Sequence, residues 1–228
     1  MALILNIDTS TEICSVAIAM DGKLLALKEN GEGLNHSVLL GVYVDEILKE
    51  NGIQAQELDA VAVSMGPGSY TGLRIGVSLA KGICFGTGKP LIAISTLKAL
   101  AISVARDIDE EAFFCPMIDA RRMEVYSAIF NRKGETIRGV QAEIIDSSSF
   151  GDLLSDHKIY FFGNGSGKVK EVIVHPHARF VDEVTTSAVN MMPLAEEKWR
   201  EKAFEDLAYF EPFYLKDFIA TVPKKKVL

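Results

Sequence analysis

The stretch SMGPGSYTGLRIG, residues 64–76, places four glycines where a buried strand is expected to give way to a helix. Gly66, Pro67 and Gly68 suit a tight turn, and Ser69 can cap the helix that follows. Glycines at such a junction have two ordinary explanations. They cradle a phosphate at the helix N-terminus, or they keep the backbone bare so that another element can approach it closely.

The elements around this stretch occur twice, in the same order, along the 228 residues. Short apolar runs between turn signals predict strands, and apolar residues at helical spacing predict helices. In the first half we expect strands at 3–7, 13–20, 23–27, 60–64 and 91–94, and helices at 36–50, 70–85 and 96–106. In the second half we expect strands at 113–118, 124–130, 136–144, 159–162 and 179–181, and helices at 147–154, 168–172 and 188–202. This duplicated βββαβαβα order predicts an α/β fold of two lobes, residues 1–107 and 108–228, each with a mixed sheet and helices on its faces.

Composition narrows the classes of function. The chain carries a formal net charge of −7, and an acidic chain is a poor candidate to bind nucleic acid on its own. Its only basic run, Lys224–Lys226, is predicted to be a solvated tail. Cys14, Cys84 and Cys115 are far apart, which predicts reduced thiols in a cytoplasmic protein. No apolar run reaches the roughly 18 residues of a membrane span, and the N-terminus lacks the basic start of a signal peptide.

Three motifs carry a resemblance to a known family. Asp8 and Asp119 each end the first strand of their half, an order that resembles the ribonuclease H-like superfold of actin, heat-shock ATPases and sugar kinases. The segments LNIDTST (5–11), SMGPGSYTGLRIG (64–76) and IDARRMEVYSAIF (118–130) more narrowly resemble the TsaB family, also called YeaZ. The positions that match the motifs of this family are Gly66, Gly68, Ser69, Thr71, Arg74, Asp119, Arg121 and Arg122.

The resemblance implies an actin-like fold and a role in forming N6-threonylcarbamoyladenosine at position 37 of ANN-decoding tRNAs. It implies a non-catalytic, activating subunit that binds the catalytic subunit TsaD, acts together with the ATPase TsaE, and pairs with itself when TsaD is absent. ATP and metal are then expected in the partner subunits, with no cofactor on this chain, and tRNA is contacted only indirectly.

The residues themselves leave a second class open, an ATPase or small-molecule kinase. ATPases of this superfold need glycine in the two aspartate turns so that backbone N–H groups can close on the phosphates. The first turn, Asp8-Thr9-Ser10-Thr11, has none, and the second, Asp119-Ala120-Arg121-Arg122, has two long side chains instead. Weak candidates for nucleotide contact are Asp8, Thr9, Asp119, Gly163 and Gly165. Arg121 and Arg122 could instead clamp an anion or the carboxylate of a partner.

A glycopeptidase is the third class. No pair among the four histidines has the i, i+4 spacing of a helical metal site, so we expect no metal, and no GxSxG elbow marks a serine nucleophile. His36 is expected to be a surface or capping residue at the start of its helix.

Small and apolar residues on two neighbouring helices predict a partner interface. Gly72, Gly76 and Ala80 recur every fourth position, beside Leu73, in a helix whose apolar arc is too wide for one packed face. Stripes of this kind let two backbones approach closely. The helix at 36–50 adds Val38, Gly41 and Val42. The alternative is close packing of the glycine helix inside its own lobe.

Overall fold

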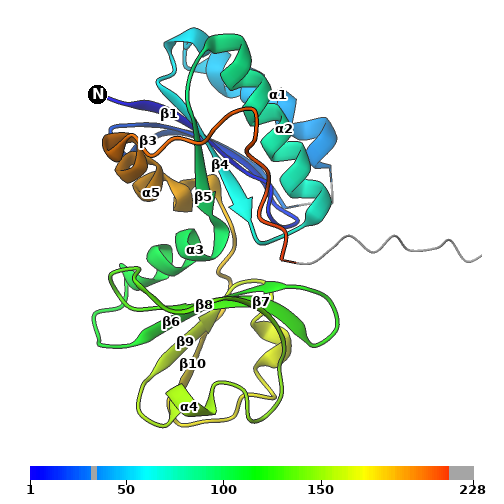
Figure 1. The fold of residues 1–228 in the computed structure, drawn as a ribbon, viewed down its shortest axis with the longest axis vertical. Coiled ribbons are helices and arrows are strands. Elements are labelled where there is room, and N and C mark those ends of the chain that lie inside the picture. The colour runs from blue at the N-terminus through cyan, green and yellow to red at the C-terminus, as the bar shows by residue number, and fades with distance from the viewer. Residues whose placement is uncertain (32–34, 216–228) are drawn as a thin grey trace, which may run out of the picture.

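The computed structural model describes residues 1–31 and 35–215, and it consists of two lobes, each built on a five-stranded sheet (Figure 1). The first half comprises β1 (Leu3–Asp8), β2 (Cys14–Met20), β3 (Lys23–Asn30), α1 (His36–Glu50), the short 3-10 helix η1 (Ala55–Glu57), β4 (Ala60–Gly66), α2 (Tyr70–Thr87), β5 (Leu91–Ser95) and α3 (Thr96–Ala105). The second half comprises β6 (Phe113–Asp119), β7 (Glu124–Phe130), β8 (Thr136–Ile144), α4 (Gly151–Leu154), β9 (Ile159–Phe162), η2 (Gly167–Val169), β10 (Ala178–Val181) and α5 (Ala188–Glu201).

The two sheets have the same topology. The first runs β3-β2-β1-β4-β5, and the second, read from its other edge, runs β8-β7-β6-β9-β10. In each, three strands form an antiparallel meander, and the other two add parallel to the first strand of that meander. The predicted duplication and the α/β class are therefore confirmed. The strands that end in Asp8 and Asp119 are the central strands of their sheets.

Both faces of the first sheet are covered by helices, which explains why its central strands carry apolar side chains on both faces. On one face Leu5 and Val61 pack with Leu40 of α1 and Val77 of α2. On the other face the neighbouring residues, which point the opposite way along each strand, pack against α5.

The last helix of each half lies between the two sheets. Leu100 and Val104 of α3 pack against Phe114 and Phe130 of the second sheet, whereas α5 packs against β1, β2, β3, β4 and β5 of the first. The predicted boundary of 108–228 for the second lobe is therefore wrong at its C-terminal end. The second sheet spans 113–181, and the chain then returns to the first lobe, because the apolar face of α5 is buried on that sheet.

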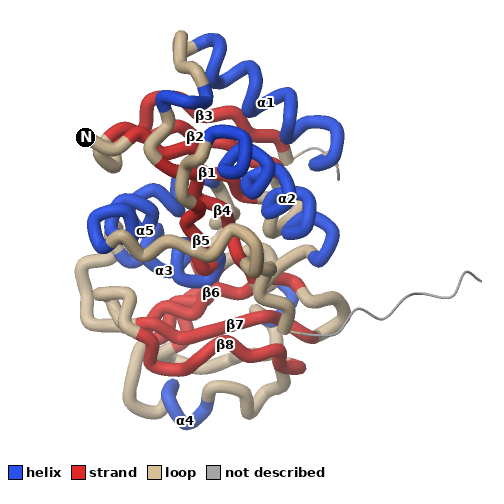
Figure 2. The backbone as a smooth tube through the Cα atoms, turned by 45° about the horizontal axis from the view of Figure 1, so that its top comes forward, coloured by secondary structure: helices blue, strands red, loops and turns tan. Residues whose placement is uncertain are grey.

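The described part of the aromatic segment after α5 lies across the first lobe beside α2 (Figure 2). The Glu205 amide donates to the Leu91 carbonyl at 2.9 Å, and Lys81 Nζ donates to the Phe210 carbonyl at 3.0 Å. The Phe213 amide donates to the Met65 carbonyl at 2.7 Å. The basic run Lys224–Lys226 lies outside the described residues.

Two predicted helices of the second half shrink to single turns, α4 and η2. Ahead of α4, Asp146 accepts hydrogen bonds from the Ser148 amide and from the Ser148 and Ser149 hydroxyls. Local side-chain bonds of this kind offer the backbone an alternative to a helix. Phe150 then takes a left-handed conformation, with φ +63°, so the helix can begin only at Gly151.

Candidate functional site

The first aspartate turn is buried and satisfied internally. Asp8 ends β1 with 3% of its surface exposed, and its Oδ1 accepts hydrogen bonds from the Ser10 amide at 2.9 Å and the Ser10 hydroxyl at 2.7 Å. The Thr9 amide donates to Ser64 Oγ at 3.4 Å. Burial raises the pKa of Asp8 above its ordinary value of 3.8, and the bonds from Ser10 and Ser64, together with the nearby His36, offset this in part.

Three glycines of the opening stretch form the surface on which this turn rests. The Ser69 amide donates to the Ser10 carbonyl at 2.7 Å, and the Thr9 hydroxyl donates to the Gly72 carbonyl at 2.7 Å. A β-carbon at Gly68, Gly72 or Gly76 would lie closer than 3.0 Å to an oxygen of Ser10 or Thr9. The glycines therefore admit the backbone of the aspartate turn, which leaves no room between turn and helix for a phosphate.

This packing corrects part of the predicted partner interface. Gly72, Leu73, Gly76 and Ala80 are all buried inside the first lobe, so these four residues do not face a partner. Close helix packing within the lobe, the alternative explanation, holds for the glycine stripe. His36, expected at the surface, is also buried, with 3% exposed.

The other predicted interface residues do lie at the surface. Val38 is 67% exposed and Val42 is 46% exposed on α1, and the space beside Gly41 is open. Sequence reasoning missed Phe85, in the last turn of α2, which is 85% exposed. Its signal is present in the sequence, because Phe85 follows Ser78 and Lys81 at helical spacing and so lies on the same side of the helix as these two polar residues.

The remaining motif residues of the first lobe lie at the turn between β4 and α2 or in the first turns of α2. Ser69 caps α2, as predicted, because its Oγ accepts the Gly72 amide at 3.2 Å. Gly66, with φ +108°, is the residue of this turn that needs glycine for its conformation. Thr71 is exposed, and the Arg74 guanidinium lies over the Tyr70 ring, 5.1 Å from its centroid.

The second aspartate turn is also satisfied within the chain. Asp119 forms an ion pair with Lys168, whose Nζ also donates to the Glu124 carbonyl at 2.6 Å. The Arg121 amide donates to Asp119 Oδ1 at 2.9 Å. The Ala120 amide donates to the Glu124 carbonyl at 3.1 Å. These amides would have to be free to bind a phosphate.

Glycines again pack against the strand that carries the aspartate. A β-carbon at Gly163 or Gly165 would lie closer than 3.0 Å to the backbone of Met117 or Ile118 in β6. Asn164, between them, accepts the Asp119 amide at 3.0 Å and donates to Glu12 of the first lobe at 2.9 Å. The candidates for nucleotide contact lie at the ends of β1, β6 and β9, and each of these segments is packed against its own lobe.

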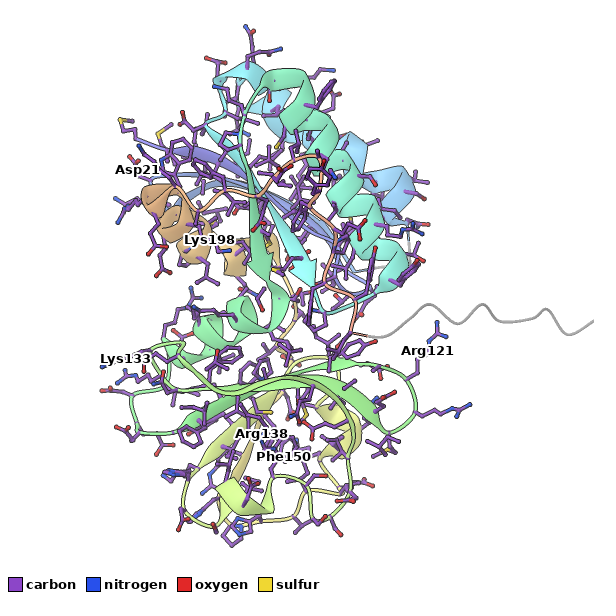
Figure 3. All side chains as sticks on the ribbon, in the orientation of Figure 1. Asp21, Arg121, Lys133, Arg138, Phe150 and Lys198 are labelled. Atoms are coloured by element: carbon purple, nitrogen blue, oxygen red, sulfur yellow. The ribbon has the colours of Figure 1, made fainter. Side chains whose placement is uncertain are left out.

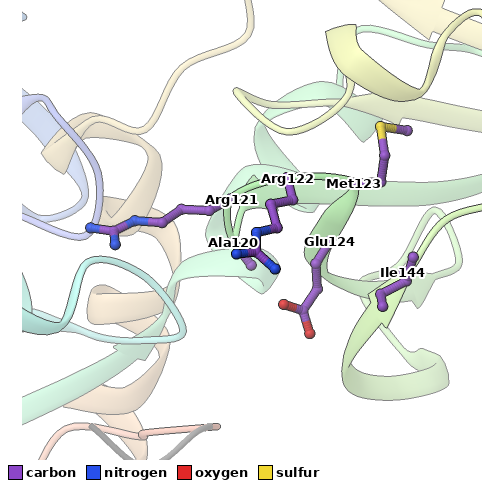
Figure 4. A pocket seen from close by; sticks show the side chains of 6 residues that line it. All are labelled: Ala120, Arg121, Arg122, Met123, Glu124 and Ile144. Carbon is purple, nitrogen blue, oxygen red and sulfur yellow. The ribbon is translucent and has the colours of Figure 1, made fainter. Parts of the chain in front are cut away.

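Arg121 and Arg122 differ from their neighbours in this turn. Both are exposed, and both take left-handed backbone conformations, with φ +71° and +52°. Arg121 extends from the turn toward the side of the first lobe (Figure 3). A shallow hollow of about 520 Å³ lies at the turn, lined by Ala120, Arg121, Arg122, Met123, Glu124 and Ile144 (Figure 4).

Other site classes find less support in the described parts of the chain. No group of three or more His, Cys, Asp or Glu side chains there could hold a metal ion. The three cysteines are all buried and unpaired. Over the same residues, no helix is both long and apolar enough to cross a membrane.

Comparison with known proteins shows which family this chain resembles. A family model described as TsaD, tRNA N6-adenosine threonylcarbamoyltransferase, matches residues 33–224. The TsaB proteins of Escherichia coli and Haemophilus influenzae, both named tRNA threonylcarbamoyladenosine biosynthesis proteins, are 30% and 29% identical, over 95% and 94% of this chain and 96% and 93% of their own. A solved structure of YeaZ from Pseudomonas aeruginosa superposes with a TM-score of 0.80 at 28% identity, covering 94% of this chain and all of that one.

The fold and the two aspartate turns thus define a two-lobed, actin-like protein in which both turns are closed by the chain's own side chains and backbone. Within this class the chain belongs to the TsaB (YeaZ) family, inside the wider group that the threonylcarbamoyltransferase model describes.

Proposed function

We propose that this chain is a non-catalytic subunit of the machinery that forms N6-threonylcarbamoyladenosine in tRNA, and that it binds a TsaD-type catalytic subunit through the exposed face of α1 and α2. Its relatives are named for the biosynthesis of this nucleoside. The observation that carries the interface is the exposure of three large apolar side chains on two adjacent helices, Val38, Val42 and Phe85. Large apolar side chains exposed together on a protein surface mark sites of protein–protein interaction.

The same face carries small residues that would let a partner helix approach closely. On α1, Gly41 is exposed, and on α2 the exposed positions Ser78, Gly82 and Gly86 have small side chains or none. A β-carbon at Gly41, Gly82 or Gly86 would meet nothing within 4 Å. The small residues therefore stand free to admit another backbone, in contrast to the glycines buried under Thr9.

A non-catalytic role is supported by the two aspartate turns. In ATPases of this fold the turn amides must be available to phosphates, whereas here the amides of Ser10 and Arg121 bind Asp8 and Asp119. We therefore assign ATP and metal to the partner subunits, a TsaD-type transferase and a TsaE-type ATPase, in the cytoplasm. We expect tRNA to contact this chain only indirectly, and two copies to pair through the same helices when the catalytic subunit is absent.

Co-elution with a TsaD-type subunit of the same organism tests the interface. Val42→Asp and Phe85→Asp each place a charge on the face, and losing the burial of one large apolar side chain costs about 1.5–3 kcal/mol, so affinity should fall at least tenfold. Val174→Asp is the matched control, because Val174 is 84% exposed on the second lobe. Co-elution that survives both helix variants, or is lost equally in the control, would place the interface elsewhere.

The role in the pathway is tested separately in cells. Depleting the protein should lower the amount of threonylcarbamoyladenosine in ANN-decoding tRNAs, as measured by mass spectrometry of digested bulk tRNA. Unchanged levels of this nucleoside after depletion would contradict the proposed function even if the two subunits bind each other.

A further inference from the structure

The turn between β6 and β7 holds two arginines in a conformation that arginine rarely adopts. Residues other than glycine with positive φ are uncommon, and two in succession at Arg121 and Arg122 are more so. Strain of this kind persists where it serves a function or where the surroundings impose it. Two long cationic side chains extend from this turn (Figure 4).

Neither guanidinium is neutralised by the part of the chain that the structure describes. Lys168, close to the same turn, is paired with Asp119, and Arg132, in the next turn along the chain, is paired with Asp109 at 2.7 Å. No described carboxylate lies within ion-pairing distance of Arg121 or Arg122. Within residues 1–31 and 35–215, the charge of each guanidinium is therefore left uncompensated by an ion pair.

The hollow beside the arginines is mostly apolar. Ala120, Met123 and Ile144 contribute side chains to its lining, and Ile144 is 73% exposed. A ligand that fits this surface has an apolar group for Met123 and Ile144 and negative charge for the two arginines. Guanidinium groups match carboxylates in a planar, bidentate geometry, and arginine is enriched among residues that dominate binding at protein interfaces.

We propose that residues 120–124, together with Ile144, bind an acidic segment of a partner protein. In this arrangement one apolar side chain of the segment rests on Met123 and Ile144, and carboxylates on either side of it pair with Arg121 and Arg122. This surface lies on the second lobe and uses charge, so it is distinct from the helical face of α1 and α2.

An acidic peptide fits better than an RNA strand because of the groups around the arginines. Glu124 is part of the lining, and the whole chain carries a net charge of −7. A strand with a phosphate on every nucleotide would bring its other charges against this acidic surround. A peptide segment can limit its carboxylates to the two positions that face the arginines.

Nuclear magnetic resonance of the full, isotope-labelled chain tests the proposal. The probe is a five-residue peptide with a central leucine, one glutamate on each side of it and a glycine at each end, blocked at both ends. The same peptide with lysines, and an oligouridylate of ten nucleotides, are the comparison ligands. We expect the acidic peptide alone to shift the backbone amides of 120–124 and the Ile144 methyl groups, with an effect that weakens as salt is added.

A pair of variants separates recognition from folding. Arg121→Asn/Arg122→Asn removes both charges while asparagine tolerates the left-handed backbone, and it should weaken peptide binding at least tenfold. Lys133→Asn removes an exposed lysine from the next turn and should leave binding unchanged.

Equal binding by the double variant, or the absence of shifts at 120–124, overturns the proposal. Stronger shifts with the oligouridylate overturn it in favour of a nucleic-acid site. Phe85→Asp should bind the peptide normally, so this result is independent of the proposed helical interface.

Discussion

Asn164 and Glu12 join the two lobes where their aspartate turns come together, with Asn164 Nδ2 donating to Glu12 Oε2 at 2.9 Å. The same Asn164 side chain accepts the Asp119 amide, so one residue links the second aspartate strand to the first lobe. The region where an ATPase of this fold would open around a nucleotide is instead bridged by side chains.

Asn164→Asp should therefore destabilise the chain. An ionised aspartate still accepts the Asp119 amide, but it cannot donate to Glu12, and it adds a third carboxylate beside Glu12 and Asp119. Because these groups are exposed, we expect a loss of only about 1 kcal/mol at neutral pH, measured by urea unfolding. Added salt should recover part of the loss, as should Glu12→Gln in the same background. A variant as stable as the parent at low salt would show that this bridge contributes nothing.

Asp8→Asn should stabilise the chain at neutral pH. Because burial raises the pKa of Asp8, its contribution to stability is fully present below 3.8 and is lost as pH rises through the raised value. Asparagine keeps an oxygen for the Ser10 donors without a buried charge. We expect Tm to rise by on the order of 2–4 °C at pH 7, about 1 kcal/mol for a chain of this size, and the difference to vanish toward pH 4. A difference that stays constant between pH 4 and pH 8 would show that Asp8 does not titrate in this way.

The isolated chain should not bind ATP. The Ser10 amide of the first aspartate turn and the Arg121 amide of the second already bind Asp8 and Asp119, and Lys168 pairs with Asp119. Calorimetry with ATP and magnesium should give no binding tighter than about 1 mM, equivalent to roughly 4 kcal/mol. Micromolar binding that is lost in Asp8→Ala would support the alternative class of ATPase or kinase.

Much of the fold could be predicted from local patterns. The strands that end in Asp8 and Asp119 are short apolar runs bounded by turns, and Ser69 is a recognisable cap, so the duplicated order was accessible from sequence. The crossing of α5 to the first lobe was not, because a helical pattern shows which residues share a face but not which sheet covers that face.

The residues around the candidate site could be predicted less well than the fold, because their neighbours are distant in the sequence. A wheel of α2 groups Gly72, Gly76 and Ala80 correctly, but it cannot say that Thr9, more than sixty residues earlier, fills the space beside Gly76. The pattern therefore predicts a partner beside the small stripe, where the structure has the aspartate turn. The left-handed conformations of Arg121 and Arg122 had no local signal either, because neither residue is one that favours positive φ.

The most direct test of the central claim compares two glycines of α2 that lie six residues apart. Gly76 faces Thr9, whereas the space beside Gly82 is open on the outer face of the helix. Both variants, Gly76→Leu and Gly82→Leu, are measured for melting temperature and for co-elution with a TsaD-type subunit.

Gly76→Leu should lower the free energy of unfolding of the lobe by about 1–3 kcal/mol through overpacking. If this variant fails to bind the partner, we expect the cause to be unfolding of the lobe. Gly82→Leu should melt at or above the temperature of the parent, because leucine favours a helix by up to about 1 kcal/mol over glycine, and should still fail to co-elute. A folded, stable Gly76→Leu variant that loses its partner, together with a Gly82→Leu variant that keeps it, would contradict the account and place the interface on the opposite face of α2.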